Sequence, residues 1–238
     1  AIGLYERAIW ATQRTVEINP NVHFPYEGFA VNYMCLGRFA DAAASLRRAA
    51  ELKLEIPSLL VARYYLAFLD GDEASMKREF DRARGQREAE DWLPHHQALV
   101  FAHSGQMRNA RRMWRQAIAL AQQTGDLGRA AIYRVAEAVC DAHFGNFEAA
   151  KEGAHAALAL KTGRDVEFAA AFALALSSDI TGSQTLAAEL ANEFPEDTTV
   201  QFQYLPILRA LFAMSQKAPL DATEHLQMSV RSEEHTSE

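Results

Sequence analysis

Small side chains recur at a fixed interval along the first half of the chain. Glycine stands at four positions, each 34 residues after the last: Gly3, Gly37, Gly71 and Gly105. The residue five places after each is Ala8, Ala42, Met76 and Ala110, and the residue twelve places after is Thr15, Ala49, Ala83 and Ala117. Small side chains at fixed offsets are expected where two helices approach closely. The pattern predicts antiparallel helix pairs, with a glycine in each turn because glycine readily adopts a positive φ.

A 34-residue unit of helix, turn and helix resembles the tetratricopeptide (TPR) repeat. The stretch from Gly3 to Pro20 resembles the second half of such a unit, closing proline included, and so does the stretch from Leu36 to Ala42. The resemblance implies an all-α, right-handed TPR-type α-solenoid over residues 1–230. We expect a half repeat over residues 1–20 and then about six degenerate repeats, which gives about thirteen helices.

The period loosens in the second half of the chain. The next turn glycine is Gly145, after an interval of 40 residues that we assign to a longer connection at Thr124–Gly128. Ser178 and Lys217 then take the turn position in place of glycine. The small position five residues later is still kept, by Ser183 and Ala222.

Both ends of the chain suggest a piece of a longer protein. The sequence opens inside a repeat, so the first helix is expected to lack its partner. Residues 231–238 read like a translated sequencing adapter, and the apolar helix pattern stops at Val230. We therefore expect residues 231–238 to be a non-native tail whose removal leaves the stability of the fold unchanged.

Composition and charge narrow the function classes. The net charge of −7 disfavours nucleic-acid binding, and the 49% hydrophobic content excludes a disordered chain. The longest fully apolar run, Phe168 to Leu176, has nine residues, too few to cross a membrane. Cys35 and Cys140 lie in different repeats and are interpreted as buried thiols in a reducing, cytoplasmic compartment.

No motif for catalysis or nucleotide binding is present, so we expect no catalytic residue and no cofactor. The carboxylates from Asp70 to Glu73 are better explained by Asp72 capping the next helix. His96 and His103 are seven residues apart on one helix face, about 10.5 Å along the axis, which is too far for one zinc ion. We therefore predict no metal site.

Two surfaces remain as candidates for partner binding. The first is a basic stripe on the second helix of one repeat, formed by Arg108, Arg111, Arg112 and Arg115. It is interpreted as a solvated outer face, with docking to an acidic partner as the alternative.

The second surface is the concave groove, which is lined by first helices in TPR arrays. The repeat register assigns ten residues to it: Val61, Tyr65, Phe68, Trp92, Leu99, His103, Val139, His143, Phe168 and Phe172. The set is apolar and aromatic, and it lacks the lysines and asparagines that clamp a C-terminal carboxylate in some TPR co-chaperones. Such a groove suits an apolar segment of a protein or peptide partner. The alternative is that these residues pack between neighbouring helices.

Three further stretches carry a closer resemblance: Tyr64 to Asp72, Gly163 to Val166, and Phe194 to Pro206. They resemble the C-terminal TPR tails of large bacterial serine/threonine protein kinases, and similar tails follow winged-helix regulators. The resemblance implies a sensory or docking region of a bacterial signalling protein. No catalytic residue carries over, because no kinase motif matches.

Overall fold

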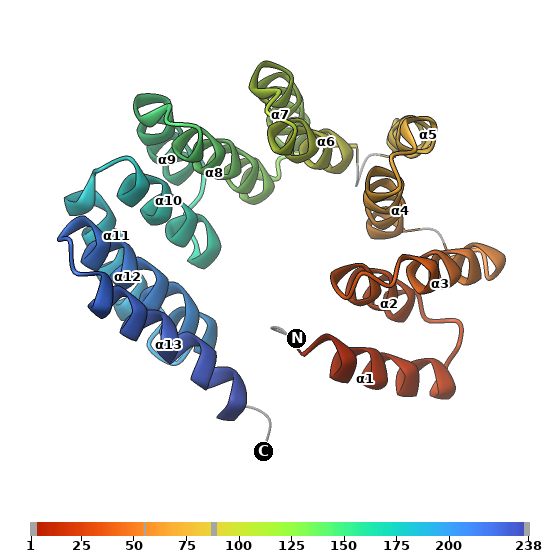
Figure 1. Cartoon of the computed structure of the whole chain (residues 1–238). Coiled ribbons are helices and arrows are strands. Elements are labelled where there is room, and N and C mark those ends of the chain that lie inside the picture. The colour runs from red at the N-terminus through yellow and green to blue at the C-terminus, as the bar shows by residue number, and fades with distance from the viewer. Residues whose placement is uncertain (1–3, 55, 87–89, 236–238) are drawn as a thin grey trace. The chain divides into compact units, whose positions relative to one another are not determined.

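The computed structural model describes residues 4–54, 56–86 and 90–235, with side chains as far as residue 227. Within those ranges the chain forms thirteen α-helices and no strand, with the helices in adjacent pairs (Figure 1). The prediction of an all-α, TPR-like fold is thereby confirmed. The chain divides into two compact units, Ala1–Gly105 and Gln106–Glu238.

Unit 1 holds the first six helices. They are α1 (Tyr5–Ile18), α2 (Phe24–Cys35), α3 (Phe39–Glu51), α4 (Pro57–Leu69), α5 (Glu73–Ala83) and α6 (Trp92–His103). Helix α1 packs on α2, while α2 pairs with α3 and α4 pairs with α5. The buried side chains of one core cluster gather around Leu46 and Leu59, and those of a second around Tyr64 and Leu93.

Unit 2 holds the remaining helices. They are α7 (Met107–Gln123), α8 (Leu127–His143), α9 (Phe147–Leu160), α10 (Arg164–Leu176), α11 (Ile180–Glu193), the π-helical turn η1 (Val200–Tyr204), α12 (Leu205–Ser215) and α13 (Pro219–His235). The pairs are α8 with α9, α10 with α11 and α12 with α13. An alanine-rich cluster joins α8, α9 and α10, and a cluster around Leu190 and Leu208 joins α10, α11 and α12.

The predicted turn positions have the conformation that the repeat requires. Gly37, Gly71 and Gly145 lie between paired helices with φ of 71°, 70° and 75°, and Gly105 follows α6 with φ of 72°. Ser178 and Lys217 adopt the same left-handed conformation, with φ of 65° and 61°. The assignment of these two residues to the glycine position is therefore correct. Gly3 lies outside the described residues.

The small position five residues after the turn lies where two helices touch. Ala42, Ala110, Ala150 and Ser183 are all 0% exposed. Ser183 donates its hydroxyl to the carbonyl of Ala171 at 2.7 Å, so its buried polar group has a partner. A larger side chain at these positions would push the paired helices apart.

Two sequence expectations about segment ends need correction. The connection between α7 and α8 is short, since only residues 124–126 separate the helices. The longer interval comes instead from α7 and α8, which have 17 residues each. Helix α13 continues to His235, past the expected end at Val230, because residues 231–235 contain no glycine or proline to stop it. Residues 236–238 of the proposed tail lie outside the described part.

Candidate docking surfaces

The ten predicted groove residues divide between the two units. Six belong to unit 1, from Val61 to His103, and four belong to unit 2, from Val139 to Phe172. Eight are half-buried and the two histidines are exposed. These side chains therefore lie at the edges of the cores, where part of each is open to a partner.

In unit 1 the predicted residues connect α4 to α6. The Tyr65 hydroxyl lies 2.7 Å from Nδ1 of His96, and their rings meet edge to face at 5.2 Å between centroids. Phe68 meets His103 in the same way at 5.8 Å. Val61 and Trp92 pack against the Tyr64–Leu93 core cluster. Many of these side chains therefore pack between α4 and α6, the first helices of neighbouring repeats.

Burial shifts the pKa values of Tyr65 and of the two histidines at the start of α6. Burial lowers the pKa of His95 to about 3 and that of His96 to about 4, so both rings are neutral at pH 7. Burial raises the pKa of Tyr65 to about 12. No group of three or more metal-binding side chains occurs among the described residues. The histidines therefore act as apolar packing groups, with Tyr65 satisfying one nitrogen of His96.

In unit 2 four aromatic side chains follow one another across α8, α10 and η1. We call them the aromatic row: His143, Phe172, Phe168 and Tyr204. His143 stacks on Phe172 at 5.9 Å, Phe172 lies 6.1 Å from Phe168, and Phe168 stacks on Tyr204 at 3.9 Å. Val139, the fourth predicted residue of this unit, packs beside them on the alanine-rich cluster of α8, α9 and α10.

A polar network holds the Tyr204 end of the aromatic row. Tyr204 donates its hydroxyl to Asp165 at 2.9 Å. Arg164 donates Nε to Asp165 at 2.8 Å and Nη1 to Asp197 at 2.9 Å. The hydrogen bond from Arg164 lowers the pKa of Asp165, so this carboxylate is charged at neutral pH. Burial and the bond to Asp165 raise the pKa of Tyr204 to about 12, which keeps its phenol protonated.

The π-helical turn places Tyr204 in the aromatic row. Asp197 accepts a hydrogen bond from the Val200 backbone N–H at 3.0 Å, which starts the turn. The Leu205 N–H then reaches back five residues to the Val200 carbonyl. Pro206 follows, and a wide turn relieves the clash between a proline ring and the carbonyl four residues earlier in a regular helix. The groove residues assigned from the sequence end at Phe172 and omit Tyr204, although Tyr204 lies 13 residues before Lys217 as Trp92 lies 13 residues before Gly105.

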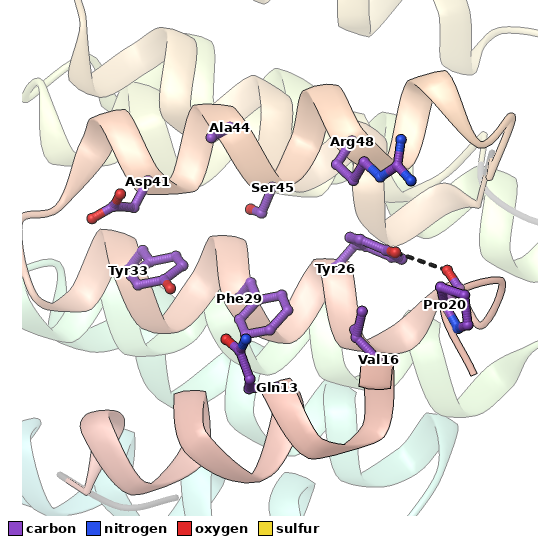
Figure 2. Close-up of a pocket in the computed structure, with 10 residues that line it drawn as sticks. All are labelled: Gln13, Val16, Pro20, Tyr26, Phe29, Tyr33, Asp41, Ala44, Ser45 and Arg48. Atoms are coloured by element: carbon purple, nitrogen blue, oxygen red, sulfur yellow. Dashed lines mark hydrogen bonds between the residues drawn. The ribbon is translucent and has the colours of Figure 1, made fainter. Parts of the chain in front are cut away.

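Unit 1 also has an open cavity of about 330 Å³ between α1, α2 and α3 (Figure 2). Phe29, Tyr26 and Tyr33 of α2 line it together with Val16 of α1. The Tyr26 hydroxyl is occupied by the Pro20 carbonyl at 2.7 Å. At the rim, Arg48 is paired with Glu51 and Asp41 with Arg38. Tyr26, Arg48 and Asp41 are thus engaged within the protein.

The remaining sequence candidates have structural roles. Asp72 caps α5, since its side chain accepts a hydrogen bond from the Ser75 N–H at 2.9 Å, as predicted. Arg111 of the basic stripe forms an ion pair with buried Asp141, while Arg108, Arg112 and Arg115 are exposed.

The two cysteines are less buried than we expected. Cys35 is exposed, because it ends α2 beside the turn, and Cys140 is half-buried. Burial nevertheless raises the pKa of the Cys140 thiol to about 11. No helix in the described part of the chain combines the length and apolar character needed to span a bilayer.

Comparison with known proteins addresses the fold. No family model matches the sequence, and no curated protein sequence matches it. Among solved structures the chain is similar to a TPR-repeat subunit in the crystal structure of the APC/C hetero-tetramer Cut9-Hcn1. The identity is 13% and the TM-score is 0.52, and the match covers 96% of this chain and 43% of the other. The chain thus spans less than half of that neighbour's length, and the likeness establishes a TPR-like helical fold.

Proposed function

We propose that the chain is a non-catalytic protein-interaction scaffold, and that the aromatic row of unit 2 is its docking surface. The observation that carries the proposal is the contiguous row from His143 to Tyr204, in which His143 is exposed and the other three rings are half-buried. Its rings come from α8, α10 and η1, so a bound segment would contact these three elements together. Large aromatic side chains at such sites supply much of the energy of protein interfaces.

The partner that fits this row is an apolar segment of another protein or of the parent chain. The four rings contact one another in order along the row and offer an apolar surface to such a segment. Phe202 of η1, which is 49% exposed, adds a further apolar side chain on the element that carries Tyr204. An apolar side chain placed against these rings would remove apolar surface of both partners from water, which favours binding.

The experiment is a selection of twelve-residue peptides from a random display library against the folded chain. We expect the wild-type chain to enrich a defined set of peptides, and Phe168→Ala to weaken their binding about 30-fold, which corresponds to about 2 kcal/mol. Phe147→Ala is the control, because Phe147 is a phenylalanine of the same unit that lies on α9, outside the aromatic row, and is 44% exposed. It is expected to bind the peptides like the wild type.

Circular dichroism must first show that both variants remain folded. Failure to enrich any peptide, or equal weakening by the two folded variants, would contradict the proposal. Enrichment that Phe168→Ala leaves intact would place the docking surface elsewhere.

For the parent protein, we propose a cytoplasmic bacterial signalling protein in which this chain is the C-terminal docking region. The support is the resemblance of Gly163–Val166 and Phe194–Pro206 to the TPR tails of bacterial serine/threonine protein kinases. The alternative parent is a winged-helix transcriptional regulator. The reading frame upstream of Ala1 distinguishes them: a glycine-rich loop with H-R-D and D-F-G indicates a kinase, and a winged helix indicates a regulator.

A further inference from the structure

Negative charge is concentrated in the segment of the chain that contains α10 and α11. Residues 161–200, which include α10 and α11, contain two basic and seven acidic residues. This segment therefore carries −5 of the chain's net −7. A partner that approaches the row meets a negative field, which favours association with positive charge.

The nearest of these charges is Asp165, at the end of the row. Its side chain is 51% exposed, and the carboxylate touches the hydroxyl of Tyr204. Arg164 is shared between Asp165 and Asp197, so the three side chains together keep a charge of −1. Since a carboxylate has about four acceptor positions, Asp165 retains capacity for one more donor.

A second acidic side chain on α10, Glu167, is buried and does not add to this exposed charge. Glu167 is 4% exposed, and its Oε2 has no hydrogen-bond partner among the described residues. Burial, together with the charges of Glu193 and Glu189, raises the pKa of Glu167. The N-terminal half of α10 therefore combines the aromatic ring of Phe168 with the charged carboxylate of Asp165.

We infer that the aromatic row binds a partner segment that carries an arginine or lysine next to apolar side chains. The inference rests on the proposed function and specifies the chemistry of the partner. A basic side chain at the Tyr204 end would pair with Asp165 and lie near the ring of Tyr204, which attracts cations. The apolar side chains that follow it would contact Phe168 and Phe172.

The composition of the selected peptides tests this inference separately from the proposed function. We expect arginine or lysine to be enriched at one position beside apolar residues. For such a peptide, Asp165→Asn should weaken binding about threefold to tenfold, the range for a partly exposed ion pair. The asparagine keeps an oxygen that can accept from Tyr204, so the row should keep its geometry. Glu148→Gln is the matched control, because it removes one charge at an 86% exposed side chain on α9.

The outcomes separate the two claims. Peptides without basic enrichment that still depend on Phe168 would overturn the inference and leave the proposed function standing. The inference alone also fails if Asp165→Asn and Glu148→Gln weaken binding equally, or if 0.5 M salt leaves the affinity of a basic peptide unchanged. If no peptide is selected, the proposed function fails and the inference fails with it.

Discussion

Two residues at the same place in the repeat have different surroundings in the two units. Tyr65 and Phe172 each lie six residues before a turn position, Gly71 and Ser178. In unit 1, α6 brings His96 onto Tyr65, and burial keeps the histidine neutral. In unit 2 the aromatic row continues from Phe172 through Phe168 to Tyr204. The hydroxyl of Tyr204 donates a hydrogen bond to half-exposed Asp165. Repeat register alone therefore does not distinguish the packed surface of unit 1 from the docking surface proposed in unit 2.

The largest expected effect is a loss of stability in unit 1 on acidification. The pKa values of His95 and His96 in the folded protein, about 3 and 4, lie below the usual 6.5. The unfolded chain therefore binds more protons as the pH falls below 6.5, and stability decreases by up to about 1.4 kcal/mol per pH unit for each histidine. In unit 2 burial raises the pKa of Glu137 and Glu167. The folded state binds these protons before the unfolded state does, so acidification favours folding through these two groups.

Hydrogen exchange of the whole chain between pH 6.5 and 5, corrected for intrinsic rates, measures this difference. Protection in α4 and α6 should decrease more than protection in α10 and α12. His96→Gln, which removes one of the two histidines, should reduce the pH dependence. Equal losses in the two units would contradict the assignment to these histidines.

A smaller effect is expected when the tyrosine hydroxyl is removed, at Tyr65 in unit 1 and at Tyr204 in unit 2. Tyr65→Phe leaves the half-buried His96 without its partner and is expected to cost about 1–3 kcal/mol. Tyr204→Phe removes a hydrogen bond to half-exposed Asp165, which water replaces, and is expected to cost about 0.5–1 kcal/mol. Urea unfolding of the two variants measures both values. A larger loss for Tyr204→Phe would reverse the comparison.

The smallest effect concerns the turns. Gly71 has a φ of 70°, and no atom lies within 4 Å of an added Cβ, so Gly71→Ala should cost about 1 kcal/mol from backbone strain alone. Ser178 already bears that strain, with φ of 65°, so Ser178→Gly should stabilise unit 2 by about 0.5 kcal/mol. Thermal unfolding measures both. A neutral Gly71→Ala would show that the turn relaxes out of the left-handed region.

These turns show how much of the fold the sequence predicts. A positive φ and a close helix contact each require a particular kind of residue, so Gly37, Ala42 and their repeats reveal the architecture through spacing alone. Ser178 and Lys217 can be identified as turn residues from the sequence, because a small residue, Ser183 or Ala222, follows each of them five positions later.

The candidate site is less predictable. The sequence assignment includes Phe168 and omits Tyr204, and the stacking of these two rings depends on how η1 packs against α10. The pairing of Arg111 with Asp141, 30 residues apart, likewise depends on how two helices pack rather than on a local pattern. Exposure also separates residues of one type, since Cys35 lies at a helix end while Cys140 is half-buried within α8.

The most direct test of the docking surface is hydrogen exchange of the whole chain with and without a selected peptide at saturation. We predict that the peptide slows exchange in α10 and η1, around Phe168 and Tyr204, and leaves α4 and α6 unchanged. Protection confined to α4 and α6, or to α7 around Arg108 and Arg112, would contradict the assignment of docking to the aromatic row.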